Sequence, residues 1–177
     1  MKDEIYEPRE DSFLLKKYVK KFAKGKVLDM GTGSGIQAKA ALENTDEVIA
    51  ADINKSAVKH AKNKGIRAVC SDLFSNIKGK FDLIIFNPPY LPEEEGRGEL
   101  ALSGGKKGHE LVERFLKQAK PHLKKNGKIL LVASSLTGDI RKLGKRLDYN
   151  IKELESASFF FEKISIYLLE YSSKNAR

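Results

Sequence analysis

KVLDMGTGSG, residues 26–35, decides the fold, because an apolar strand runs directly into three glycines that alternate with small polar residues. A helical pattern follows from about Ile36 to Leu42, so the segment reads as strand, turn and helix. Small residues at such a turn let the backbone and a ligand approach each other closely. The stretch therefore predicts an α/β fold with a ligand site at the end of its first strand.

Apolar runs of strand length alternate with helical patterns along the rest of the chain, which is typical of βα units around a mainly parallel sheet. No long helix separates the last two strands, so we expect them to pair antiparallel. The pattern predicts an α/β, doubly wound, Rossmann-like sheet of seven strands in one domain, residues 1–177. The expected strands are 26–30, 47–52, 69–72, 81–86, 128–133, 151–154 and 163–169, and the expected helices begin near residues 10, 36, 54, 109 and 137.

Composition favours a globular protein, with 41% hydrophobic and 32% charged residues in 177. The first four residues do not resemble a signal peptide, and no apolar run approaches the roughly 18 residues that span a membrane. The single cysteine, Cys70, has no partner for an internal disulfide or a metal site and is expected in a buried strand. We expect a cytoplasmic protein that has no resident metal.

The formal charge of +9 is compatible with nucleic acid or an acidic protein as a partner. Lysines are spread along most segments rather than gathered in one block. That distribution favours a solvated, charged surface.

Residues near the glycine turn indicate which cofactor it holds. Asp52 ends the second strand roughly 20 residues later, where a carboxylate grips two ribose hydroxyls. The spacing around Gly31 and Gly33 is GxGxG, and Ile36 stands where a third dinucleotide-fingerprint glycine is expected. Asp29 beside the glycines would repel a phosphate but attract an ammonium. An amino acid joined to a nucleoside fits both ends, which predicts S-adenosylmethionine.

The third strand also ends near this cofactor site. Asp72 is expected to accept a hydrogen bond from the adenine amine, while Leu73 covers the ring. Asp72 is alternatively a helix or turn cap.

Asn87-Pro88-Pro89-Tyr90 directly follows the apolar run 81–86, at the carboxyl end of a strand, where open α/β sheets bind ligands. The two prolines make the turn rigid. The Asn87 amide oxygen and the Pro88 carbonyl provide two acceptors, and Tyr90 adds a flat apolar face. This set predicts a pocket for a planar NH2 group, of a carboxamide or of a nucleobase. The glycine-rich, acidic segment 91–107 that follows is expected to be a substrate-facing loop.

Together, DMGTGSG at 29–35, Asp52, Asp72 and the tetrapeptide from Asn87 resemble the class I S-adenosylmethionine-dependent methyltransferases. More narrowly, the chain is similar to the HemK-type family, which methylates the glutamine side-chain amide of peptide chain release factors. YEPREDSFLL at 6–15 and GGKKGHE at 104–110 resemble its eukaryotic and archaeal branch.

The resemblance implies roles for single residues. It places Ser12, where the family often has threonine, in the cofactor site together with Asp29, Gly31, Asp52, Asp72 and Leu73. It also implies that Asn87 contacts both the cofactor and the target amide, and that a small zinc-binding activator protein is a partner.

Three other functions stay open at this point. A nucleic-acid methyltransferase acting on exocyclic base amines shares the tetrapeptide, but no target-recognition segment or basic arm is visible. A nicotinamide-dependent oxidoreductase shares the glycine turn but leaves the tetrapeptide unexplained. A non-catalytic binding subunit would retain the cofactor fold.

Overall fold

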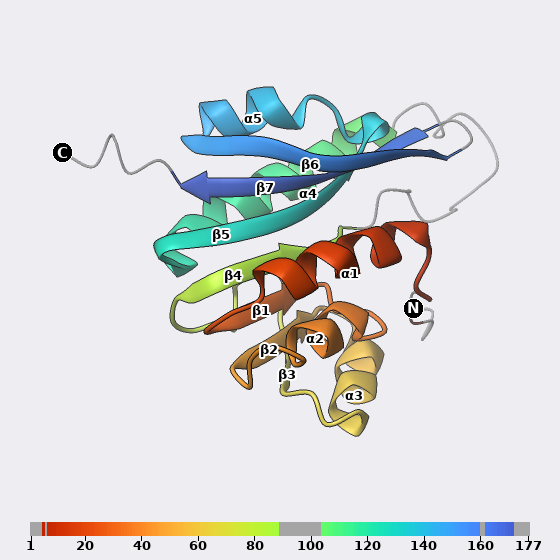
Figure 1. The fold of residues 1–177 in the computed structure, drawn as a ribbon, viewed down its shortest axis with the longest axis vertical. Coiled ribbons are helices and arrows are strands. Elements are labelled where there is room, and N and C mark those ends of the chain that lie inside the picture. Colours follow the sequence, from red (N-terminus) through yellow and green to blue (C-terminus); the bar gives the residue numbers. More distant parts are fainter. Residues whose placement is uncertain (1–4, 6, 89–103, 160–161, 172–177) are drawn as a thin grey trace.

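The computed structural model describes residues 5, 7–88, 104–159 and 162–171, and it builds them around one seven-stranded sheet (Figure 1). The strand order is β3-β2-β1-β4-β5-β7-β6. β1 to β5 run parallel, and β7 pairs antiparallel with both β5 and β6. The strands are β1 (Val27–Met30), β2 (Val48–Asp52), β3 (Ala68–Cys70), β4 (Phe81–Phe86), β5 (Leu123–Ser134), β6 (Tyr149–Phe159) and β7 (Glu162–Tyr171).

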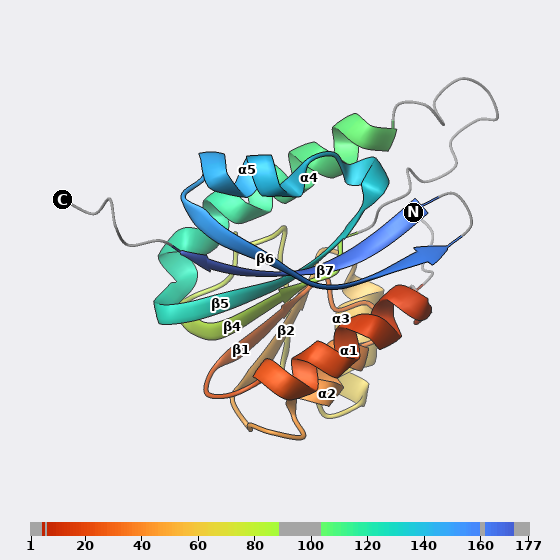
Figure 2. The ribbon, with the colours of Figure 1, turned by 45° about the horizontal axis from the view of Figure 1, so that its top comes forward.

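Helices cover both faces of this sheet, as Figure 2 shows. On one face lie α1 (Glu10–Phe22), α2 (Ile36–Ala41) and α3 (Lys55–Asn63), and on the other lie α4 (Gly104–Ala119) and α5 (Ile140–Arg146). Two short 3₁₀ helices, η2 (Lys120–His122) and η3 (Ser135–Thr137), flank β5. The predicted doubly wound α/β fold with an antiparallel C-terminal pair is therefore confirmed.

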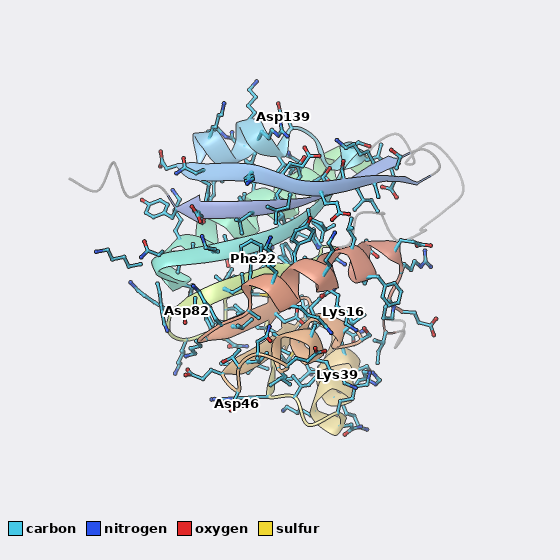
Figure 3. All side chains as sticks on the ribbon, viewed as in Figure 1. Lys16, Phe22, Lys39, Asp46, Asp82 and Asp139 are labelled. Carbon is cyan, nitrogen blue, oxygen red and sulfur yellow. The ribbon has the colours of Figure 1, made fainter. Side chains whose placement is uncertain are left out.

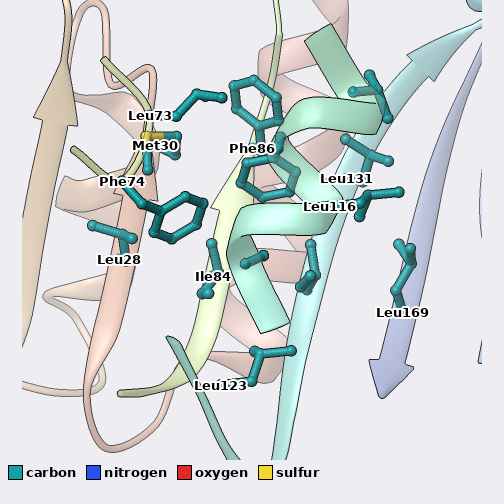
Figure 4. Close-up of a cluster of buried hydrophobic side chains, with 14 of the residues drawn as sticks. Leu28, Met30, Leu73, Phe74, Ile84, Phe86, Leu116, Leu123, Leu131 and Leu169 are labelled. Carbon is teal, nitrogen blue, oxygen red and sulfur yellow. The ribbon is translucent and has the colours of Figure 1, made fainter. Parts of the chain in front are cut away.

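Two apolar cores, one on each face, hold the layers together. One core packs the α1, α2 and α3 side against residues such as Val27, Leu83 and Leu130. The other joins α4 and α5 to the opposite face of the same strands, with Phe86 stacked on Phe115 at 4.2 Å between ring centroids. Figure 4 shows this second cluster. Strands that are buried on both faces explain why the sequence shows continuous apolar runs rather than alternation.

The order of the strands fixes where a ligand binds. β1 pairs with β2 on one side and with β4 on the other, with Met30 aligned to Ala51 and to Phe86. The connections run in opposite directions from β1, so β1 and β4 form the topological switch point of the sheet. Ligands of open α/β sheets bind outside the carboxyl ends of the strands at this point.

The C-terminal hairpin also contacts the first helix. The pairing register shifts between Glu153 and Glu155 of β6, which is a β-bulge. Beside the bulge, the Glu155 carboxylate accepts hydrogen bonds from Lys17 Nζ at 2.6 Å and from Tyr18 Oη at 2.7 Å. The Lys17 contact, followed by that of Tyr18, lowers the pKa of Glu155. A strand near the end of the chain therefore helps to hold α1 in place.

Several predicted boundaries were wrong. α4 begins at Gly104 rather than near residue 109, because glycines that suggested a loop lie inside the helix. β6 extends well beyond 151–154, to Tyr149–Phe159, because polar residues continue this edge strand, whereas β7 (Glu162–Tyr171) is close to the predicted 163–169. Cys70 is half-buried rather than buried because β3 is an edge strand. The rest of the segment predicted as a loop, residues 91–103, lies outside the described residues.

Gly127 lies in the part of β5 where the pairing register with β4 shifts, between Leu123 and Lys128. A Cβ at this position would lie 2.8 Å from the Phe81 carbonyl oxygen and 2.9 Å from that of Lys124. Both contacts are backbone atoms, so Gly127→Ala is expected to lower the free energy of unfolding by about 2 kcal/mol. Gly108→Ala is the matched control, because a Cβ there meets only Thr137 Cγ2 at 3.9 Å and the position is helical. Urea titration of both variants measures the difference, and equal stability would contradict the steric explanation.

Candidate functional site

The glycine turn lies at the switch point, directly after β1. Gly31, Gly33 and Gly35 have φ values of 66°, 49° and 80°, which side chains rarely adopt. A Cβ on Gly31 would lie 3.6 Å from the Phe86 ring and 3.9 Å from the Asn87 carbonyl oxygen. The turn after β1 therefore lies next to the end of β4, as the order of the strands requires. The sequence elements predicted for cofactor and target amide meet here.

Asp29 holds the turn in its conformation. Its Oδ2 accepts hydrogen bonds from Thr32 Oγ1 at 2.6 Å and from the Ala38 amide at 3.0 Å. The side chain is buried, and one carboxylate oxygen thus joins β1, the glycine turn and the first turn of α2. The structure gives Asp29 an anchoring role that sequence reasoning missed, and its contact with an ammonium stays a prediction.

Burial raises the pKa of Asp29 to about 7, although the hydrogen bonds from Thr32 and Ala38 act in the opposite direction. In the unfolded chain the pKa is near 3.8, so between about pH 4 and pH 7 the folded protein binds the extra proton. Stability linked to this group is therefore present at low pH and is lost as the pH rises towards 7. A difference of about three pKa units corresponds to on the order of 4 kcal/mol.

Asp29→Asn is expected to flatten this pH dependence, because an asparagine oxygen still accepts from Thr32 and Ala38 but does not ionise. Urea titrations of wild type and variant at pH 5 and pH 8 measure the effect. A wild-type stability that falls no more steeply than that of the variant between these pH values would contradict the assignment.

Asp52 ends β2 beside the same turn. Its Oδ2 accepts from the Gly33 amide at 2.9 Å and its Oδ1 from the Asn54 amide at 2.8 Å. An ionised carboxylate has about four acceptor positions, so two ribose hydroxyls can still donate to it. The next residue, Ile53, is 69% exposed, which is unusual for isoleucine. Its apolar side chain beside the predicted ribose site is a feature that the sequence pattern alone did not single out.

Asp72 and Leu73 follow β3, and they lie in different surroundings: Asp72 is partly exposed and Leu73 is buried. The Asp72 carboxylate is half-exposed and pairs with the Arg114 guanidinium of α4. Leu73 has a φ of 45° and is buried in the core cluster near Met30 and Phe86 (Figure 4). Ser71 Oγ donates to the Leu73 carbonyl at 2.6 Å and stabilises this turn. Contacts of Asp72 and Leu73 with adenine stay predictions, and an adenine amine would share Asp72 with Arg114.

Asn87 follows β4 and contacts the first turn of α1. Its Nδ2 donates a hydrogen bond of 2.8 Å to Asp11 Oδ2. Asp11 is 3% exposed, and Ser12 Oγ donates to its other oxygen at 3.3 Å. Pro88 is buried, whereas Pro89 and Tyr90 lie outside the described residues. The structure thus brings Asn87, Ser12 and the glycine turn together and adds Asp11, which sequence reasoning missed.

Gln37 connects α2 to this cluster, since its Nε2 donates to the Ser12 carbonyl at 2.8 Å. Its Oε1 is buried and has no hydrogen-bond partner among the described residues. A buried acceptor without a donor is costly, and a ligand with a donor group beside Ser12 would satisfy it. Together with the glycine turn and Asp52, this acceptor fits the predicted S-adenosylmethionine, which carries both an ammonium and ribose hydroxyls.

Two of the three histidines contact other parts of the fold. His109 Nδ1 lies 3.2 Å from the Thr137 carbonyl, and His122 stacks on Phe74 with ring centroids 4.7 Å apart. In the part of the chain that the structure describes, no group of three or more His, Cys, Asp or Glu is placed to hold a metal ion.

Lysines and arginines are distributed over several elements rather than gathered at the site. Figure 3 shows Lys16 on α1 and Lys39 on α2 among them. Several lysines and arginines pair with acids, including Lys20 with Glu43 at 2.7 Å and Arg141 with Glu153 at 2.6 Å. The candidate site, in contrast, has four aspartates, which disfavours a phosphate-bearing cofactor. The described helices include none that is long and apolar enough to cross a membrane.

The sheet order, the glycine turn at its switch point and the antiparallel C-terminal pair define the class I methyltransferase fold. The family model of the methyltransferase small domain matches residues 10–159, and the chain belongs to this family.

Comparison with individual proteins is more specific. The chain is 41% identical over 154 residues to a protein named as a protein N5-glutamine methyltransferase from Methanocaldococcus jannaschii, covering 80% of this chain and 78% of that one. It is 33% identical to methyltransferase HEMK2 of Mus musculus, covering 73% and 71%. A solved structure of similar fold is the E. cuniculi Mtq2–Trm112 complex, described as responsible for methylation of the translation termination factor eRF1. It has a TM-score of 0.75, 25% identity, and coverage of 97% of this chain and 100% of that one.

These findings confirm the predicted resemblance to HemK-type methyltransferases. They contradict the nicotinamide-dependent oxidoreductase, because the family and the relatives are methyltransferases. Methylation of nucleic-acid bases is not favoured, since the Methanocaldococcus jannaschii relative is named for glutamine methylation and the similar solved complex is described as methylating a termination factor.

Proposed function

We propose that this protein is an S-adenosylmethionine-dependent methyltransferase that methylates the side-chain amide of a glutamine in a peptide chain release factor. The observation that carries the proposal is the place of Asn87. It follows β4 at the switch point, next to the glycine turn, and a buried carboxylate holds its NH2 group. Such an asparagine presents its oxygen as an acceptor for a planar NH2 group.

Residues around the turn would hold the cofactor. Asp52 accepts from the ribose, Ser12 and the turn at Gly31 and Gly33 line the methionine part, and Asp72 with Leu73 faces the adenine. The acidic surroundings also favour a positively charged sulfonium. When bound, this cofactor supplies an activated methyl group.

The residues of the chain then act on the target amide. An amide nitrogen is a poor nucleophile because its lone pair is delocalised into the carbonyl. Acceptors at Asn87 and at the Pro88 carbonyl bind its two hydrogens, which orients the nitrogen and stabilises the positive charge that develops on it. Tyr90 packs against the plane of the amide in this proposal. A strong general base is not required, because the N-methylated cation is acidic enough to lose its proton to water.

A small partner subunit is the second part of the proposal. The similar solved structure is a two-protein complex of Mtq2 with Trm112, which supports a binary complex here. That the partner binds zinc is a prediction from the family resemblance. Co-expression with a candidate partner, followed by size-exclusion chromatography, tests whether a 1:1 complex forms.

The central experiment offers methyl-labelled S-adenosylmethionine together with a release factor that contains a Gly-Gly-Gln tripeptide. Three further arms replace this substrate: the same factor with the glutamine changed to alanine, a DNA, and an RNA. Every arm is run with and without the candidate partner. We expect label in the Gly-Gly-Gln factor alone, with mass spectrometry locating one methyl group on the glutamine. Label only in nucleic acid would overturn the proposed substrate.

A further inference from the structure

We infer that Asp11 is a positioning residue that fixes the orientation of the Asn87 amide, an inference that rests on the proposed function. Asp11 lies in the first turn of α1, 76 residues before Asn87 in the chain. Asn87 Nδ2 donates to Asp11 Oδ2 at 2.8 Å, and the Asp11 side chain is 3% exposed.

The chemistry of the pair decides which way the amide points. An asparagine amide can be turned about its last bond to exchange its oxygen and its NH2 group, and the two arrangements have nearly the same shape. An ionised carboxylate only accepts hydrogen bonds, so Asp11 stabilises the arrangement with NH2 towards itself. The Asn87 oxygen then points away from Asp11. In the opposite arrangement two oxygens would face each other, and an NH2 group would meet the substrate NH2.

The surroundings of Asp11 suit a buried carboxylate. Asp11 is in the first turn of a 13-residue helix, whose partial positive charge stabilises an anion. Its two oxygens serve two donors, because Ser12 Oγ donates to Oδ1 while Asn87 donates to Oδ2. An asparagine at position 11 would keep one oxygen and replace the other with an NH2 group, so its amide could present either a donor or an acceptor to Asn87. A carboxylate presents an acceptor in both arrangements, which makes Asp11 the stronger constraint on the Asn87 amide.

The cluster is also held rigidly against the sheet. Gln37 of α2 donates to the Ser12 carbonyl at 2.8 Å, and Leu15 and Val19 of α1 are fully buried. α1 therefore cannot shift without breaking apolar contacts and hydrogen bonds. The orientation of the Asn87 amide is thus determined by the packing of α1 and not only by the turn after β4.

The test compares Asp11→Asn and Asp11→Ala with Glu10→Gln, a control that removes one charge at the exposed neighbouring position. We expect kcat for release-factor methylation to fall about tenfold in Asp11→Asn and about 100-fold in Asp11→Ala. KM for the release factor and the calorimetric Kd for S-adenosylmethionine should stay within about threefold, and Glu10→Gln should match wild type.

A reversed pair adds a rescue test. Asn87→Asp alone places two carboxylates against each other. Adding Asp11→Asn gives position 11 an NH2 group, which donates to the carboxylate now at position 87. We expect the double variant to recover at least about tenfold in kcat over Asn87→Asp, because the oxygen again points away from position 11. No recovery would overturn the inference.

Side-chain amide NMR tests the geometry without activity. The Asn87 NH2 signal, assigned with Asn87→Asp, should show slow hydrogen exchange in wild type and faster exchange in both Asp11 variants. Unchanged exchange and unchanged kcat, or a loss of kcat matched by an equal loss of cofactor affinity, would overturn the inference. If wild type binds S-adenosylmethionine but methylates no release factor, the proposed substrate fails, while the NMR result still decides the role of Asp11.

Discussion

Replacing Asn87 by alanine is expected to reduce kcat for methyl transfer by at least about 1,000-fold, the largest effect of any single substitution at this site. The variant removes the acceptor that orients the target nitrogen and stabilises its developing charge. It leaves the glycine turn and Asp52 in place, so the Kd for S-adenosylmethionine should change by less than about tenfold. Single-turnover assays with the release factor measure the rate, and isothermal titration calorimetry measures the affinity.

Asn150→Ala is the control for this experiment, because Asn150 is an exposed asparagine on β6, on the edge strand of the sheet. It should retain wild-type kcat. Turnover of Asn87→Ala within about tenfold of wild type on the Gly-Gly-Gln factor would show that Asn87 is not the acceptor.

Asp52→Ala should instead act on the cofactor and raise the Kd for S-adenosylmethionine by about 100-fold. Hydrogen bonds to a charged group contribute about 1.5–3 kcal/mol each, and two ribose hydroxyls would lose their acceptor. The loss of the contacts from the Gly33 and Asn54 amides also loosens the turn. Calorimetry gives the affinity, and thermal unfolding shows how much of the loss is structural.

Asp46→Asn provides the matched control, because Asp46 is an exposed aspartate just before β2, at the opposite end of that strand from Asp52. It changes the net charge by one unit without touching the site. If Asp52→Ala and Asp46→Asn bind the cofactor equally well, the ribose role of Asp52 is wrong.

Much of the fold could be predicted because its signals are local. Continuous apolar runs identified the five parallel strands. A helix was predicted to begin near residue 54, and the Asn54 side chain caps α3 by accepting from the Ser56 amide. The predicted ends of two elements were wrong, because a residue type can occur in more than one kind of structure. Glycines that suggested a loop lie inside α4, and polar residues continue β6. In both cases tertiary packing overrides local preference.

In the candidate site, too, features set by local sequence could be predicted, and contacts set by tertiary packing could not. Asp29 and Asp52 lie at the carboxyl ends of their strands and Asn87 directly follows one, so their meeting at one edge of the sheet follows from parallel pairing. The contact between Asp11 and Asn87 depends on how α1 packs, which no local pattern reveals. The pairing of Asp72 with Arg114 was missed for the same reason, since 42 residues separate them.

The bond between α1 and the bulge in β6 has a consequence for protein synthesis. Tyr18 and its acceptor Glu155 are 137 residues apart, so α1 leaves the ribosome long before one of its docking partners exists. Contacts over such separations form late in folding. Because α1 carries Asp11 and Ser12, the nascent chain gains this support for its acceptor site only after β6 has been translated. A chain truncated before β6 would retain the glycine turn and Asn87 in its sequence but lack this support for α1.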